Sequence, residues 1–191
     1  MFTHLQRTSR MLIMLAFCST FVGCTTVEST AKVSTKLTAM QFNRVASAYL
    51  ERETSTELWK TSDGATMLHV TFALYGQGRG GAIFVKGNMQ QYTAHIEKFL
   101  EWARLAEVRN EALTKEIGRA PTWVPGSSGN LRFTFHSAST RTHVLHITTC
   151  TIICIDETAL VLNSVGAREL QRLLVDFDEG RLRVVDASAY R

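Results

Sequence analysis

Histidines and cysteines cluster between residues 136 and 154, and their chemistry decides which kinds of site this chain could hold. His136, His143 and His146 could ligate zinc or act as bases in a hydrolase. On a strand, His143 and His146 would point to opposite faces, because an odd number of positions separates them. Their spacing matches no known zinc site, so we predict no metal site and interpret them as ordinary histidines of a sheet.

Two conformations are open for the segment between Cys150 and Cys154. On a straight strand, the two side chains would lie about 13 Å apart, at ~3.3 Å per residue, which is too far for a bond. If residues 151–153 form a turn or a bulge, a disulfide becomes feasible. The alternating pattern favours the strand, whereas an oxidising compartment would favour the bond. Redox catalysis is not indicated, because the spacing is not Cys-x-x-Cys.

The glycines of Gly76-x-Gly78-x-x-Gly81 match the dinucleotide-binding fingerprint and follow a predicted strand. That fingerprint works only where a helix begins, because the helix N-terminus holds the pyrophosphate. Here residues 82–85 continue as a strand. We therefore interpret the glycines as a hairpin loop and predict no cofactor.

No nucleophile, base and orienting acid come together at any one place in the sequence. Gly126-Ser127-Ser128-Gly129 lacks the Gly-x-Ser-x-Gly pattern of a nucleophile elbow and is typical of a loop. The sequence therefore favours a non-enzymatic role. The alternative is a periplasmic hydrolase-type enzyme, with its site near residues 136–146 or in a loop over residues 119–130.

The N-terminal residues have the composition of an export signal. Arg7 and Arg10 precede an uncharged apolar run over residues 11–22. As a helix this run rises only ~18 Å, too short for a hydrocarbon core of ~30 Å, so a permanent transmembrane span is not expected. A basic start, a short apolar run and a small residue before a cleavage point are typical of a secretory signal.

Phe21-Val22-Gly23-Cys24 resembles the lipobox of bacterial lipoproteins, in which Leu, a small residue and Gly or Ala precede Cys. Phe21 replaces the usual leucine, and Val22 is larger than usual. The resemblance covers residues 1–24 and implies that the signal peptide 1–23 is removed and that Cys24 carries lipid. Thr25, in place of the Asp that retains some lipoproteins in the inner membrane, points to the outer membrane, facing the periplasm. The alternative is an ordinary signal cleaved elsewhere.

The charge of the mature chain argues against one class of partner. Removal of residues 1–23 takes away two arginines and no acidic residue, so the charge falls from +4 to about +2. A nearly neutral domain has no electrostatic footprint for nucleic acid, and nucleic-acid binding is not expected. An apolar content of 45% suits one globular domain with a substantial core.

Hydrophobic periodicity predicts an α+β fold with antiparallel sheets and two helices. Alternation over residues 68–75 and 131–135 indicates strands. Apolar residues at helical spacing predict a long helix over residues 89–117 and a shorter helix at about 164–178. Each helix follows a short apolar strand, at 82–85 and at 159–162, so we predict two strands-then-helix units, as in a degenerate duplication.

The N-terminal part of the mature chain is predicted to be less ordered. Residues 24–36 are rich in Ser and Thr and are interpreted as the lipidated cysteine and a flexible tether. Residues 37–191 would then form a single periplasmic α+β domain. Within it, Phe42, Val45 and Tyr49 have helical spacing and predict a helix near residues 38–52.

The long helix carries apolar residues beside its main stripe. Trp102 and Leu105 widen its apolar surface, and Trp123 lies in the predicted 119–130 loop. These three residues are either buried between two sheets or contact a partner, because aromatic anchors dominate many interfaces. The sequence thus predicts a lipid-anchored envelope protein with a binding or accessory role. Its expected partners are the membrane, through the lipid, and an envelope protein or a second copy.

Overall fold

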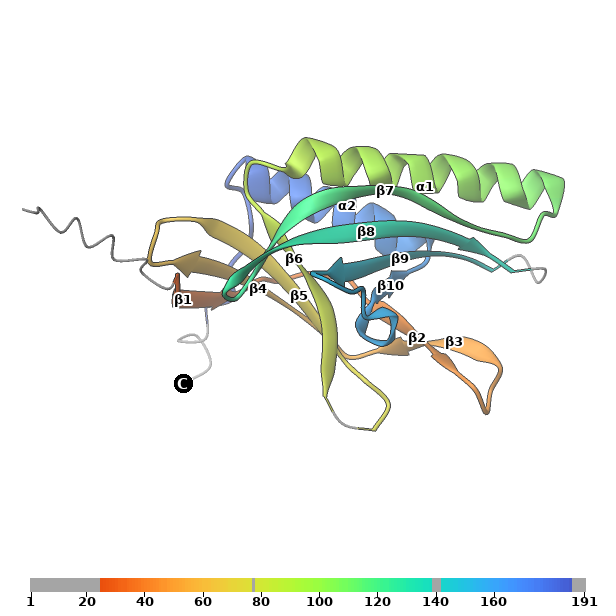
Figure 1. Cartoon of the computed structure of the whole chain (residues 1–191), viewed down its shortest axis with the longest axis horizontal. Helices are drawn as coiled ribbons and strands as arrows, with labels where there is room; N and C mark the ends of the chain where they lie inside the picture. Colours follow the sequence, from red (N-terminus) through yellow and green to blue (C-terminus); the bar gives the residue numbers. More distant parts are fainter. Residues whose placement is uncertain (1–24, 77, 139–141, 187–191) are drawn as a thin grey trace, which may run out of the picture.

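The computed structural model describes residues 25–76, 78–138 and 142–186, which form two antiparallel sheets and two helices (Figure 1). The strand order is β1-β4-β5-β6 in the four-stranded sheet and β3-β2-β10-β9-β8-β7 in the six-stranded sheet. The α+β class is therefore confirmed. The predicted signal peptide and the lipidation of Cys24 lie outside the described residues.

The four-stranded sheet consists of β1 (Val27–Lys32), β4 (Thr54–Thr61), β5 (Thr66–Ala73) and β6 (Arg79–Val85). The six-stranded sheet consists of β2 (Ala39–Asn43), β3 (Ala48–Arg52), β7 (Leu113–Val124), β8 (Ser127–Ser137), β9 (His143–Cys150) and β10 (Leu160–Leu162). The helices are α1 (Met89–Arg109) and α2 (Ser164–Asp178), and a short 3₁₀ turn, η1, covers Asp156–Thr158.

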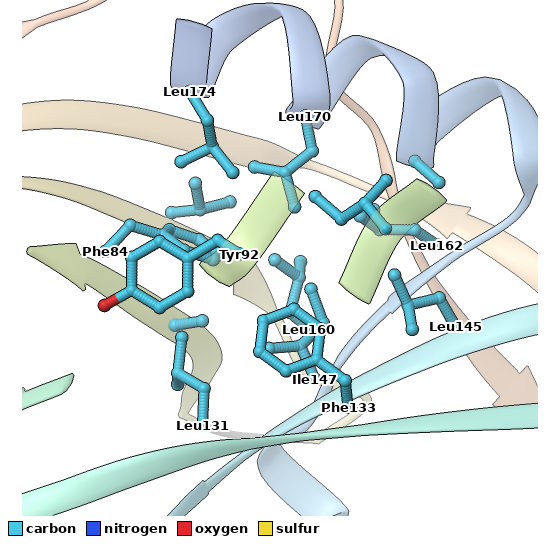
Figure 2. Close-up of a cluster of buried hydrophobic side chains, with 14 of the residues drawn as sticks. Phe84, Tyr92, Leu131, Phe133, Leu145, Ile147, Leu160, Leu162, Leu170 and Leu174 are labelled. Carbon is cyan, nitrogen blue, oxygen red and sulfur yellow. The ribbon is translucent and has the colours of Figure 1, made fainter. Parts of the chain in front are cut away.

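One core joins both sheets to both helices. Alternation along the strands turns every second side chain inward, and the apolar stripes of α1 and α2 cover the same face of the six-stranded sheet (Figure 1). The four-stranded sheet adds inward residues from β5 and β6. Figure 2 shows the centre of this core, where none of the labelled side chains retains exposed surface: Phe84, Tyr92, Leu131, Phe133, Leu145, Ile147, Leu160, Leu162, Leu170 and Leu174.

The predicted pair of strands-then-helix units is present. β4, β5 and β6 form a three-stranded meander that leads into α1, and β8, β9 and β10 form another that leads into α2. Asn163 caps the N-terminus of helix α2, because its side chain accepts a hydrogen bond of 2.9 Å from the backbone N–H of Gly166.

The long helix is shorter than predicted. It ends at Arg109, and Asn110 adopts the left-handed conformation with φ of 55°, a common way for a helix to stop. Residues 113–117, predicted as its last turns, begin β7 instead. Neither helix of the described ranges has the length and apolar character needed to cross a membrane.

The predicted tether over residues 24–36 is wrong where the structure describes it. Residues 27–32 form β1, which pairs with β4, and Val33 is buried in the core. The predicted helix near residues 38–52 is also wrong, because this segment is the β2–β3 hairpin. The side chain of Asn43 organises its turn by accepting hydrogen bonds of 2.9 Å from the backbone N–H groups of Val45 and Ala46.

The predicted loop over residues 119–130 is mostly strand. β7 and β8 continue through it and turn only at Pro125 and Gly126. Pro121 is tolerated inside β7 because β7 is an edge strand, where one side of the backbone needs no partner strand.

Candidate functional site

The face of the six-stranded sheet that points away from the helices carries a polar cluster. On β8, Phe133 and Phe135 point into the core, so Arg132, Thr134 and His136 point the other way. β9 pairs with β8 so that His146 lies opposite Thr134. We call this surface the outer face of the six-stranded sheet.

Four side chains form a line of contacts across the outer face, from β3 to β7. The hydroxyl of Tyr49 lies 3.3 Å from Nε2 of His146, and the rings of His146 and His136 have centroids 5.9 Å apart. Nδ1 of His136 lies 2.6 Å from the hydroxyl of Thr114. The line therefore contains two histidines, each in contact with a hydroxyl.

The inner part of this line is uncharged at neutral pH. Burial lowers the pKa of His146 to about 4, and the neighbouring His136 and Arg132 act in the same direction, against Asp156. Burial also raises the pKa of Tyr49. Both groups are thus neutral, and this lets the Tyr49 hydroxyl donate to Nε2 of His146.

The two carboxylates beside the histidines are already held by arginines. Asp156 accepts a hydrogen bond from Arg132 and another, of 2.9 Å, from the hydroxyl of Thr148. Burial alone would raise the pKa of Asp156, but the hydrogen bonds from Arg132 and Thr148 outweigh it and lower that pKa. Glu116 accepts a hydrogen bond of 2.9 Å from Arg119.

The four side chains of the line, together with Arg132 and the two carboxylates, line a pocket of about 430 Å³ that unites histidines, hydroxyls and acids. The carboxylates, however, are engaged with guanidinium groups rather than orienting an imidazole. The arrangement therefore resembles a polar surface with paired charges more closely than a catalytic triad. Among the described residues, no group of three or more His, Cys, Asp or Glu side chains could hold a metal ion.

A larger groove of about 940 Å³ adjoins this pocket, and the two share Tyr49 and His136. Its wall on the β2–β3 hairpin is apolar: Phe42 packs edge-on against Tyr49 with ring centroids 5.4 Å apart, yet 49% of Phe42 is exposed. Met40 and Val144 extend the apolar wall. The hollow runs from the outer face to the helix side of the sheet, where residues of α1 and of the start of α2 also line it, and we call it the outer-face groove.

The charge of the outer-face groove is low. Among the described residues that line it, Glu107 is the only Asp, Glu, Lys or Arg, and the others are histidines, apolar residues or residues with neutral hydroxyl, phenol or amide groups. The groove therefore suits a ligand that is uncharged and partly apolar.

The three predicted partner-binding residues do not form one surface. Trp102 is half-buried, edge-on to Phe135 with centroids 5.9 Å apart, so much of it serves the core. Leu105 is 40% exposed on α1. Trp123 packs instead on Trp59 of the four-stranded sheet, with centroids 6.4 Å apart.

Cys150 and Cys154 form a disulfide, which settles the choice left open by their spacing. β9 ends at Cys150, and the backbone N–H of Thr151 donates to the carbonyl of Ile153, so the chain turns between the cysteines. The turn leaves Ile152 fully exposed. Of the fingerprint glycines, Gly76 and Gly78 lie between β5 and β6, as the hairpin interpretation predicts, whereas Gly81 already belongs to β6 and pairs with Thr71, so a strand rather than a helix follows the turn.

Sequence reasoning missed Tyr49, Thr114 and Arg132. Tyr49 was assigned to a helix, and Thr114 was placed in the last turns of the long helix. Arg132 could have been found from the alternation of β8, whose polar residues share one face.

No protein-family model matches this chain, and no curated protein or solved structure matches it.

Proposed function

We propose that this protein is a lipid-anchored protein of the bacterial cell envelope. The lipid would be attached at Cys24 and the domain would face the periplasm from the outer membrane. Residues 1–24 support the proposal through their basic start, short apolar run and lipobox-like Phe21-Val22-Gly23-Cys24. Two or more acyl chains on one cysteine give lasting attachment, because each buried methylene contributes ~0.8 kcal/mol.

The proposed role is non-enzymatic: the outer-face groove binds an uncharged, partly apolar segment of another envelope protein. The observation that carries this role is the half-exposed Phe42 on Tyr49 at the wall of the groove. Exposed aromatic side chains beside a hollow are typical anchors of protein interfaces. The neutral Tyr49–His146 pair adds a polar group that can orient a backbone amide without demanding a charge.

The edge of the six-stranded sheet favours a protein segment over a small molecule. In the described part of the chain, β3 pairs with β2 alone, so its other edge offers free backbone groups beside the groove. An extended segment can add to such an edge as a further strand while its side chains enter a neighbouring groove. At the end of β3 away from the groove, the guanidinium of Arg52 donates a hydrogen bond of 2.8 Å to the carbonyl of Ala73, and the free edge ends there.

A matched pair of substitutions tests this role. A photo-crosslinking phenylalanine analogue replaces Phe42 in the full-length protein, in its own membranes. Ala48→Arg places a charge in the groove, whereas Ala94→Arg places the same charge on the exposed face of α1. We expect an adduct with a mapped segment of an envelope protein, lost with Ala48→Arg and kept with Ala94→Arg. An adduct that survives Ala48→Arg would contradict the role, and a self-adduct would show that the groove holds a second copy.

The alternative is a hydrolase that uses the contact between Thr114 and His136, in which a hydroxyl lies 2.6 Å from an imidazole nitrogen. Activity on ester or amide substrates that disappears in both Thr114→Val and His136→Gln would favour it over the binding role. Activity unchanged by either substitution would exclude this dyad.

A further inference from the structure

We propose that the end of the domain formed by β1 and the β4–β5 turn sits directly on the membrane, in contact with phospholipid headgroups. The inference rests on the proposed lipid at Cys24. It concerns how the domain is held, which the sequence pattern alone would assign to a long flexible tether.

The first described residues are fixed to the β4–β5 turn. The backbone N–H of Thr26 donates to the hydroxyl of Ser62 at 3.1 Å, and the backbone N–H of Ser62 donates to the carbonyl of Thr26 at 2.9 Å. The hydroxyl of Thr25 donates to the carboxylate of Asp63 at 3.3 Å. Thr25 and Thr26 are therefore part of the fold rather than a spacer.

The strand that follows, β1, leaves no flexible segment between these residues and the core. β1 pairs with β4 from Val27, opposite Thr61, to Lys32, opposite Glu57. The next residue, Val33, is buried in the core. The chain between the proposed lipid and the sheet is thus reduced to the step from Cys24 to Thr25, and one residue spans at most ~3.6 Å.

This short connection determines what the turn touches. The headgroup layers add about 10–15 Å in total to a hydrocarbon core of about 30 Å, so each layer is several ångströms thick. A turn held within a residue or two of a diacylated cysteine therefore lies among the headgroups. The exposed residues of this turn, Ser62, Asp63 and Gly64, carry no bulky apolar side chain, which is compatible with the hydrated headgroup layer.

Seating at this end would also orient the binding groove. Figure 1 shows β1 and the β4–β5 turn at one end of the long axis and the β2–β3 hairpin toward the other end. Phe42 and Tyr49 of the outer-face groove belong to that hairpin. The membrane-seated end would thus present the groove away from the bilayer, where a periplasmic segment can reach it.

The test uses the full-length lipidated protein in vesicles of phosphatidylethanolamine and phosphatidylglycerol that carry a headgroup-spin-labelled lipid. Single cysteines, Lys60→Cys beside the turn and Val45→Cys at the tip of the β2–β3 hairpin, receive a fluorophore under non-reducing conditions. Both side chains are exposed, Val45 at 97%. Glu28→Cys on β1 replaces Lys60→Cys if that variant melts early.

We expect quenching of most of the fluorescence at residue 60 and none above background at residue 45. A ten-residue Gly/Ser insertion after Cys24, beginning with Thr so that the residue after Cys24 is unchanged, spans about 18 Å and should abolish the quenching at residue 60. Equal quenching at both residues, none at residue 60, or quenching that survives the insertion would overturn the seating. The mass of the N-terminal peptide separates the two proposals, because a peptide without lipid would overturn the anchor itself.

Discussion

Two glycines, one in the β5–β6 turn and one in β6, allow a sharp test of the fold, because they share a positive φ but differ in surroundings. Gly78 has φ of 102° and Gly81 has φ of 153°. A Cβ on Gly78 would meet only the tip of Leu74, at 3.9 Å, whereas a Cβ on Gly81 would lie 2.0 Å from the backbone carbonyl oxygen of Val70. Alanine at either position pays the backbone penalty, but at Gly81 it also pushes β6 away from β5.

The magnitudes follow from these surroundings. A positive φ costs alanine on the order of 1–2 kcal/mol. At Gly81, β6 must also move by at least about 1.4 Å to restore an ordinary contact of 3.4 Å, which weakens neighbouring ladder hydrogen bonds worth about 1 kcal/mol each. We expect Gly78→Ala to lower the free energy of unfolding by about 1 kcal/mol. Gly81→Ala should lower it by about 3–4 kcal/mol, the range of strongly destabilising substitutions.

Urea unfolding of the domain, followed by tryptophan fluorescence, measures both changes. In a separate thermal unfolding experiment, the midpoint should fall by about 3 °C for Gly78→Ala and by about 10 °C for Gly81→Ala, at 2–4 °C per kcal/mol. Equal effects of the two substitutions would refute the reasoning from the close contact with Val70. Binding of a dinucleotide to the wild type would refute the interpretation of the glycines as a hairpin turn.

Three further predictions concern single features of the structure. Replacing Cys150 and Cys154 together by Ala should lower the free energy of unfolding by about 2 kcal/mol, the loop-entropy value for a short closed loop. A reductant should lower the unfolding midpoint of the wild type but not that of the double variant. Equal midpoints of the two proteins without reductant would contradict a formed bond. Trp102→Ala should lower the free energy of unfolding by about 2–3 kcal/mol because Trp102 packs on the core, whereas Leu105→Ala, at an exposed site, should lower it by less than about 1 kcal/mol. A similar large loss of stability for both variants would show that Leu105 is buried. Burial lowers the pKa of His146 from 6.5 to about 4, so the unfolded chain binds more protons between these pH values, and this residue alone should contribute a loss of stability of up to about 3 kcal/mol on acidification through that window. Burial lowers the pKa of His69 to about 4 as well, so His146→Gln should make the slope of unfolding free energy against pH shallower without abolishing it, and an unchanged slope would contradict the burial of His146.

The elements that the sequence predicted well are those with strong periodicity. Helix α2 occupies Ser164–Asp178, as predicted, because its apolar stripe and the Asn163 cap agree. Helix α1 begins as predicted but ends early, because Leu113 continues the helical spacing while Asn110 breaks the helix. A local conformation at one residue outweighed a repeat that extended past it.

The missed strands lack the apolar signal on which sequence prediction depends. β1 is an edge strand of small, polar and charged residues that is mostly exposed, so it is held chiefly by backbone hydrogen bonds to β4. The β2–β3 hairpin turns without glycine, using the Asn43 side chain and a positive φ of 49° at Ser47. Neither device leaves a strong mark in the sequence.

The candidate site was predictable only in part. His143 and His146 do face opposite sides of β9, since His143 stacks on Phe135 toward the helices while His146 contacts Tyr49 on the outer face. The register between β8 and β9, however, decides that His136 lies beside His146, and register depends on long-range packing. The contact with Tyr49 depends in addition on a strand that sequence reasoning assigned to a helix.

The central claim is that Cys24 carries the lipid that holds this domain in the envelope, and one measurement tests it most directly. Mass spectrometry of the N-terminal peptide, with fatty-acid labelling of cells, compares the wild type with Cys24→Ser. We predict that the wild type begins at Cys24 and carries acyl chains, and that Cys24→Ser accumulates as an unlabelled precursor. Labelling that persists in Cys24→Ser, or a mature wild-type protein that begins at another residue, would contradict the claim.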